Sequence, residues 1–407
     1  MSKRQGRVPQ RYGVGLDPSP SGPVPPLLEE LSRRFVQSYR QAVAQDAADP
    51  AVPRRTSAPT ASAAAAEEAY LEQRCYQVPV PTPETMAGSV RMSSLDRLAD
   101  EAESYRDPLL DRFGEHLRRL ARWNDALISA DADAVTRAST SLYGELAPET
   151  ILRAEELLHS TNYSKDHDTA TLDSTATAKV FTGLLALVAA TGWLVQTEEG
   201  LRARVAVRPA SRTLVLRQGE QFSVAEVKRL AVHEIGTHVL RAHLGSMQRL
   251  DIYGLGFGPR SMCVEEGLAV WAEQRAGLLD MVTSRRYAVR VLAVRDALVA
   301  PFGVVYNNAR THCSPREAFE VASRVKRGIG DWNLPGAHVK DKVYLEGLDL
   351  VTPVLGDRDM RRALWAGKVS DLDSRELSQL VGFTPLFDDP LDLHHHIVDH
   401  VDSTVGN

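Results

Sequence analysis

The chain has 407 residues, a formal net charge of −5 and a sequence pI near 6.2. It has no basic surplus to neutralise phosphates, which excludes a nucleic-acid partner. The apolar content of 43% is enough for a large buried core, and three widely spaced cysteines exclude a disulfide framework.

The apolar segments indicate no membrane association. The basic first fifteen residues are not followed by an apolar stretch, so we predict no secretory signal. The longest apolar run, 180–195, contains two glycines and is typical of a buried core helix rather than a membrane span. We therefore expect a cytoplasmic protein without a membrane partner.

The first 66 residues are rich in Pro, Ala, Ser and Arg, a composition that predicts a low-complexity, disordered arm. Within this arm, 26–43 has amphipathic spacing and predicts one isolated helix. We expect the folded part of the chain to begin near residue 67.

The segment 93–158 has apolar residues at helical spacing. Asp131 is a suitable N-cap, and Pro148 lies where a further helix can begin. Another helix is predicted from about residue 173 to Gly192, which suits the position after a helix end. We expect this half of the chain to be all-helical.

After residue 201 the sequence changes to alternating apolar and polar residues, a pattern typical of β-strands. Segments 204–208 and 213–217 flank a turn-prone Pro-Ala-Ser and predict a β-hairpin. Ser223 and Glu226 then form a capping box, which predicts the start of the helix that carries residues 233–238.

Residues 233–238 read His-Glu-Ile-Gly-Thr-His. A zinc hydrolase needs imidazole and carboxylate ligands, an open position for water and a carboxylate as base. On a regular helix, residues five apart differ by about 140° in direction. We therefore predict a π-turn, absorbed at Gly236, that brings His233 and His238 to one face. Glu234 then points beside the metal, which suits a general base.

Two adjacent acids, Glu265 and Glu266, begin the apolar helical stretch 264–273. A glutamate on a second helix is the usual third ligand in such sites, although two acids also favour a solvated helix N-terminus. The pattern does not decide which of them binds. Glu273 lies seven residues after Glu266 on the same face and is a candidate to orient a histidine ligand.

These motifs resemble a family whose members carry HEIGTH followed by QEGLA, and which is similar to the tyrosine carboxypeptidases that trim microtubules. The resemblance runs from about residue 95 to 347. It implies a zinc metallopeptidase that removes C-terminal Tyr or Phe. Alignment with QEGLA implies Glu266 as the third ligand and leaves Glu265 where the family has glutamine.

An exopeptidase also needs groups that recognise the substrate. Cationic side chains after the first motif are candidates to bind the terminal carboxylate, with pairing to neighbouring acids as the alternative. They are Arg241, Arg324, Arg327 and Lys340. Tyr344 is expected either to donate to the oxyanion or to fill a core. Tyr253, Phe257 and Tyr344 are candidates for an apolar pocket.

Other residues of types that can bind metal are expected to have no role in the site. The histidines at 394–396 and His400 lie near the C-terminus, where we expect a solvated tail. Cys263 is expected to be a small buried residue rather than a nucleophile.

We therefore predict an α+β fold, mostly helical and zincin-like, with a small sheet beside the active-site helix. The expected parts are the arm 1–66, a helical lobe 67–200, a zinc-binding catalytic lobe 201–390 and a tail 391–407. The predicted function is a Zn²⁺-dependent carboxypeptidase acting on a peptide or protein C-terminus. The alternatives are a zinc endopeptidase or aminopeptidase that matures a specific peptide, and a non-catalytic metal-binding regulator. The sequence indicates no oligomeric state.

Overall fold

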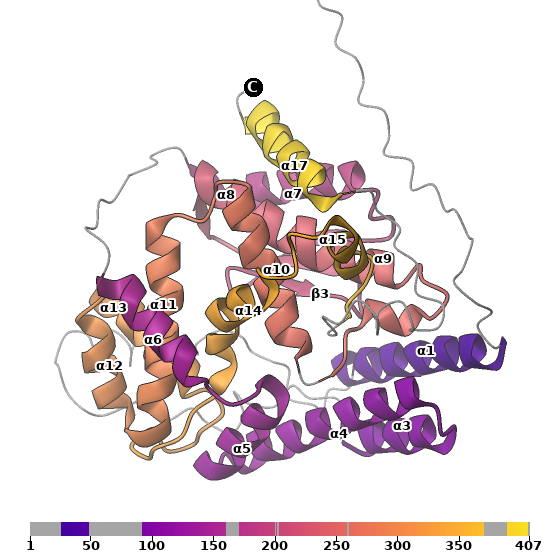
Figure 1. Ribbon diagram of the computed structural model, residues 1–407, viewed down its shortest axis with the longest axis horizontal. Coiled ribbons are helices and arrows are strands. Elements are labelled where there is room, and N and C mark those ends of the chain that lie inside the picture. The colour runs from indigo at the N-terminus through magenta and orange to yellow at the C-terminus, as the bar shows by residue number, and fades with distance from the viewer. Residues whose placement is uncertain are drawn as a thin grey trace, which may run out of the picture.

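The computed structural model describes most of the chain beyond residue 91 and one helix before it (Figure 1). The described residues are 26–48, 92–159, 171–199, 201, 203–258, 260–369 and 389–405. The rest of the predicted arm 1–66 lies outside them. The fold is mostly helical with small sheets, which confirms the α+β class.

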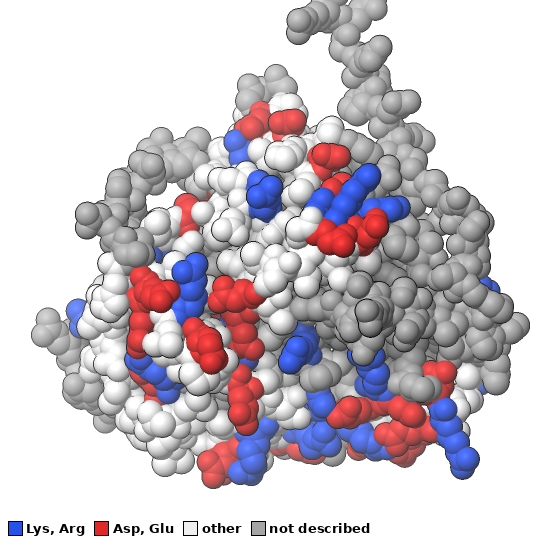
Figure 2. Space-filling view, viewed as in Figure 1, with Lys and Arg blue, Asp and Glu red and all other residues white. Residues whose placement is uncertain are grey.

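The surface carries charges of both signs. Figure 2 shows acidic and basic side chains interspersed on one face. None of the helices in the described ranges combines the length and the hydrophobicity that a bilayer span requires.

Three helices form a layer along one edge of the molecule (Figure 1). They are α1 (Pro26–Ala48), α3 (Met92–Ser104) and α4 (Pro108–Ser129). Phe35 of α1 is buried edge-on against Phe113, with ring centroids 4.4 Å apart. Ser32 donates a hydrogen bond of 2.9 Å to Asp251. The helix predicted near the N-terminus is therefore not isolated but packs on the domain.

The next helices begin where the capping signals indicate. They are α5 (Ala132–Tyr143), α6 (Pro148–His159) and α7 (Ser174–Leu187). Asp131 caps α5 by accepting a bond of 2.7 Å from the Ala134 amide, and Asp173 caps α7 in the same way. The predicted end of α7 at Gly192 is wrong, because the chain turns at Ala189, which has a positive φ of 53°.

A three-stranded sheet follows, in the order β2-β4-β3. Its strands are β2 (Leu194–Glu198), β3 (Val205–Arg208) and β4 (Thr213–Arg217). The antiparallel pairing of β3 with β4 confirms the predicted hairpin. Strand β2 pairs parallel to β4 and corrects the all-helical prediction for this part. Strand β2 lacks a buried face, and Leu194 is 59% exposed. Its sequence therefore does not show the alternation of apolar and polar residues that would predict a strand.

A two-stranded sheet joins this region to the helix that carries the first motif. Strand β1 (Thr171–Asp173) pairs antiparallel with β5 (Gln221–Ser223). The predicted capping box of Ser223 and Glu226 is present at the start of α8 (Val224–Leu230). From there the helix continues through η2 (Ala231–Val239) into α9 (Leu240–Gly245). Strand β3 contacts η2, so a small sheet lies beside this helix as expected.

Further helical elements complete the described part of the fold. They are η3 (Asp251–Gly254), α10 (Ser261–Arg275), α11 (Met281–Val299), α12 (Phe302–Arg310), α13 (Pro315–Val325), η4 (Val339–Lys342), α14 (Val343–Val351), α15 (Arg358–Trp365) and α17 (Pro390–Val405).

Helices α10 and α14 cross at two glycines. A Cβ added at Gly267 would lie 2.2 Å from the Gly347 carbonyl oxygen, and one added at Gly347 would lie 2.1 Å from that of Cys263. Only glycine permits this approach of two backbones. The crossing packs α14 on α10, and Lys340 of the preceding η4 lies 3.9 Å from Glu266 of α10.

Helix α17 corrects the prediction of a solvated tail. It contacts η2, α7 and α8, and buries Leu393, His394, Ile397 and Val401. His394 is 1% exposed, whereas His395 and His396 are exposed. The buried apolar residues recur every four positions and form one helix face.

Candidate metal centre

The HExxxH segment adopts the predicted π geometry. Element η2 is a π-helix of nine residues rather than a single turn. The Thr237 hydroxyl donates to the Val232 carbonyl, five residues earlier, at 3.2 Å. The His233 and His238 rings consequently lie on the same side, with centroids 4.8 Å apart.

Three buried side chains offer ligand atoms to a metal ion. One ligand atom each from His233, His238 and Glu266 lies within 4.8 Å of the others. The Nε2 atoms of the two histidines are 3.4 and 3.5 Å from Glu266 Oε2. A tetrahedral ion with bonds of ~2.0–2.1 Å separates its ligand atoms by about 3.3–3.4 Å. The two distances from Glu266 to the imidazole nitrogens therefore match the spacing in such a site.

Two observations favour a positive charge between these ligands. Glu266 Oε2 is buried and has no hydrogen-bond partner among the described residues. Burial alone would lower the pKa of His233, but the carboxylates of Glu266 and Glu273 raise it to about 10. A buried carboxylate oxygen without a donor is costly. A proton or a metal ion at this point offsets that cost.

The two adjacent glutamates have different neighbours. Glu266 faces the Nε2 atoms, whereas Glu265 Oε1 lies 2.8 Å from Nδ1 of His238. Arg241 and Lys368 also donate to Glu265. Burial would raise the pKa of Glu265, but these two cations hold it well below its usual range.

Glu273 has the orienting position expected for it. Its Oε1 lies 2.7 Å from Nδ1 of His233 and accepts a bond of 2.9 Å from Arg229. A carboxylate on Nδ1 fixes the ring and leaves Nε2 for a metal. We call these groups the ligand side, which comprises Arg229, His233, His238, Arg241, Glu265, Glu266, Glu273 and Lys368.

Glu234 lies beside this group and is half-buried. Burial raises its pKa, and Glu266 adds to this effect, although His233 and His238 oppose it. A carboxylate with a raised pKa is a stronger base than one in water.

Opposite Glu266, the predicted cations of the later segments converge. Lys340 Nζ lies 3.9 Å from Glu266 Oε1. Arg324 donates two bonds of 2.6 Å to Asp341. Burial lowers the pKa of Lys340, and the charges of Arg327 and Arg324 lower it further. We define the cationic wall as Arg290, Arg324, Arg327 and Lys340, together with Asp341.

Tyr344 connects the wall to the ligand side. Its ring stacks on Tyr287 at 5.0 Å between centroids, and the Arg290 guanidinium lies 5.2 Å from the Tyr344 centroid. Burial and the nearby Glu266 charge raise the pKa of Tyr344 well above its usual value. Its hydroxyl therefore keeps its proton at neutral pH and remains a donor.

Three sequence candidates lie elsewhere. Arg241 is 0% exposed and donates to Glu265 and to the carbonyls of Leu364, Gly367 and Val369, so it is not presented to a substrate. Arg241 therefore follows the alternative given above, in which the cation pairs with a neighbouring acid. Tyr253 and Phe257 are buried in the core beside Phe113, not at the wall. Cys263 is buried, as expected.

Sequence reasoning missed three charged residues of the site. Arg229 precedes His233 by four positions on a helix, a spacing that offered a signal. Lys368 and Arg290 belong to no motif, and only the fold brings them to the site.

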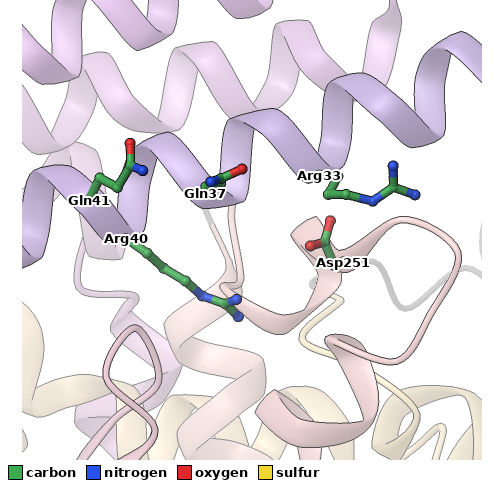
Figure 3. A pocket seen from close by; sticks show the side chains of 5 residues that line it. All are labelled: Arg33, Gln37, Arg40, Gln41 and Asp251. Atoms are coloured by element: carbon green, nitrogen blue, oxygen red, sulfur yellow. The ribbon is translucent and has the colours of Figure 1, made fainter.

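The structure also contains a cavity away from the metal ligands. A space of about 400 Å³ between α1 and η3 is lined by Arg33, Gln37, Arg40, Gln41 and Asp251 (Figure 3). None of these residues belongs to the ligand side or the cationic wall, so this cavity is separate from the candidate metal centre.

Comparison with known proteins agrees with the geometry. A family model described as microtubule-associated tyrosine carboxypeptidase matches residues 68–385, which include both motifs and the cationic wall. No curated protein matches the chain.

Proposed function

The chain belongs to the microtubule-associated tyrosine carboxypeptidase family, and on this premise we propose that it is a zinc-dependent carboxypeptidase. The observation that carries the proposal is the position of the cationic wall. Its Lys340 lies 3.9 Å from Glu266 of a buried two-histidine, one-glutamate group.

The donor set suits zinc. Two imidazole nitrogens and one carboxylate oxygen are its usual catalytic ligands, with a fourth position for water. When bound, zinc supplies a Lewis acid that lowers the pKa of water and polarises a carbonyl. His233, His238 and Glu266 hold the ion, and Glu273 and Glu265 keep the two rings oriented through Nδ1.

Two residues near the ligands carry out proton transfer and stabilise the oxyanion. Glu234 accepts a proton from the attacking water and later returns it to the leaving amine. Tyr344, which is protonated at neutral pH, donates a hydrogen bond to the carbonyl oxygen as negative charge develops there.

The cationic wall binds the terminal carboxylate of the substrate. Lys340 and Arg324 are both 29% exposed at the side chain, which keeps them accessible. Asp341 engages Nε and Nη2 of Arg324, so Nη1 serves as the additional donor. A carboxylate that leaves water is stabilised when cations pair with it. An endopeptidase does not need a group of cations that binds a terminal carboxylate.

The preference for an aromatic terminal residue follows from the family and from one local feature. The stacked rings of Tyr287 and Tyr344 lie beside Arg290 of the wall. An aromatic side chain can extend this stack. Arg290, above both rings, adds a cation–π contact.

The test uses three peptides that differ only at the C-terminus, which is free Tyr, tyrosine amide or free Ala. Mass spectrometry follows the products. We expect release of one residue from the Tyr acid, slower release from the Ala acid and no cleavage of the amide. Glu234→Gln protein, purified in parallel, controls for contaminating peptidases. Cleavage of acid and amide at equal rates, or cuts in the interior, would contradict the proposal.

A further inference from the structure

A carbonyl in the middle of η2 accepts two side-chain hydrogen bonds from distant parts of the chain. The Gly236 oxygen lies between the two histidine motif positions. Trp365 Nε1 of α15 donates to it at 2.9 Å, and His394 Nε2 of α17 lies 3.3 Å from it. Both donors are buried, at 0% and 1% exposure.

We propose that Trp365 and His394 act as positioning residues that hold η2 in its π-helical register and thereby set the spacing of His233 and His238. The proposal rests on the proposed function for its consequence, which is metal affinity. We call the two contacts of Trp365 and His394 with the Gly236 carbonyl the clamp. The clamp is formed by the protein alone and does not depend on a metal. Helix α17 lies after residue 385, where the family match ends.

The contacts around Gly236 are specific to a glycine. A Cβ at this position would lie 3.0 Å from His394 Cδ2 and 3.0 Å from Ile397 Cδ1. The absence of a side chain therefore lets α17 reach the η2 backbone. The motif glycine thus has a second role, because it admits the donor as well as absorbing the π-turn.

The chemistry of His394 fits a donor. Its environment is apolar, with Trp365 edge-on at 5.6 Å between centroids, and burial lowers its pKa to about 4. The ring is therefore neutral near pH 7 and carries one N–H. A carbonyl oxygen only accepts, so that proton lies on Nε2. Nδ1 is buried without a hydrogen-bond partner in the described ranges.

External donors favour a π-register for a simple reason. A side chain that bonds to a helix carbonyl competes with the usual amide four residues on and can bend or rewind that turn. Without the donors, η2 gains freedom to return to α-helical register. In that register, positions 233 and 238 diverge by about 140°, and both imidazoles no longer face Glu266.

The experiment compares full-length His394→Leu, His394→Gln and Trp365→Phe with the wild type. His395→Leu is the matched control, since it changes an exposed histidine on the same helix. Hydrogen–deuterium exchange of the peptide spanning 231–241, in chelator-treated protein, reports the register without any metal. Chelator competition then gives zinc affinity, and the visible spectrum of the Co²⁺-loaded protein reports coordination geometry.

We expect His394→Leu and Trp365→Phe each to speed exchange in η2 and to weaken zinc binding by about fivefold, the worth of one ordinary hydrogen bond. The Co²⁺ spectrum should change in both. His394→Gln, which retains an N–H, should recover part of each loss, and His395→Leu should match the wild type.

Unchanged η2 exchange in folded His394→Leu and Trp365→Phe proteins would overturn the inference. Equal loss in His394→Leu and His394→Gln would also overturn it, because the effect would then be packing and not the bond. A wild type that binds no zinc while the exchange results hold would refute the proposed function and leave the clamp supported.

Discussion

The two faces of the site are both rich in charge but are built differently. On the ligand side, each histidine has one carboxylate on Nδ1, and each carboxylate has its own cations: Arg229 for Glu273, and Arg241 with Lys368 for Glu265. On the cationic wall, Arg324 pairs with Asp341, the charges of Arg290, Arg327 and Lys340 also act on that carboxylate, and Lys340 faces Glu266 at 3.9 Å. Lys340 and Arg324 remain partly exposed there.

This difference indicates what each face does. Buried charges that are paired fix a geometry, because displacement of either partner leaves a charge uncompensated. Cations at a partly exposed surface attract an anion that arrives from solvent. The ligand side is therefore suited to a permanent metal ion, and the wall is suited to a transient carboxylate.

The largest expected effects come from one substitution made at two carboxylates. Glu266→Gln removes a ligand and should abolish stoichiometric metal together with activity. Glu234→Gln should retain the metal and lose about two to four orders of magnitude in kcat, as removal of a general base does. Elemental analysis and peptide hydrolysis separate the two outcomes. If Glu234→Gln loses the metal or Glu266→Gln keeps it, the roles assigned to them are wrong.

Tyr344 should behave differently from the tyrosine on which it stacks. Tyr344→Phe removes the donor to the oxyanion and should lower kcat by about 10²–10³ with little change in KM. Tyr287→Phe keeps the stacked ring and serves as the matched control, with only a minor change expected. Equal losses in the two variants would assign Tyr344 a packing role.

The wall should affect substrate but not metal. Lys340→Met is expected to lower kcat/KM for a free-acid peptide by about 30-fold, from the loss of about 2 kcal/mol of charge pairing. Its zinc content should stay near the wild-type value. Lys179→Met, at an exposed lysine of α7, controls for general loss of charge. A Lys340→Met enzyme with normal kcat/KM would remove Lys340 from carboxylate recognition.

The smallest effect concerns the pairing of Glu265. Glu265→Gln should weaken zinc binding by about tenfold, as loss of a partner to a ligand histidine does. It also leaves Arg241 and Lys368 buried without their acid, so the melting temperature should fall. Adding Lys368→Met removes one uncompensated charge and should recover part of that stability. A double variant less stable than Glu265→Gln alone would contradict this account of the pairing.

Local patterns predicted the parts of the site that depend on neighbouring residues. The five-residue spacing of His233 and His238 implied a π-turn because helix geometry alone requires it, and η2 has that geometry. The seven-residue spacing from Glu266 likewise predicted that Glu273 contacts a histidine of the motif, and Glu273 lies 2.7 Å from His233 Nδ1. Spacing alone left the choice between Glu265 and Glu266 open, and the resemblance to QEGLA implied Glu266. The fold adds the reason, since the two adjacent side chains meet different neighbours.

Contacts across long separations were not predictable. Lys368 meets Glu265 across 103 positions, and no motif marks it. Strand β2 has no buried face to produce alternation. By contrast, Leu393, Ile397 and Val401 show helical spacing in the sequence, so α17 was visible. The tail prediction rests on the position of this segment near the C-terminus, and the spacing of its apolar residues contradicts it.

The most direct test of the central claim is the zinc content of the purified wild-type chain, measured together with its activity before and after chelation. We predict about one zinc per chain. Removal should abolish release of the C-terminal residue, and added Zn²⁺ should restore it. A folded wild type that contains no bound metal and still releases C-terminal tyrosine at the same rate after chelation would contradict the account.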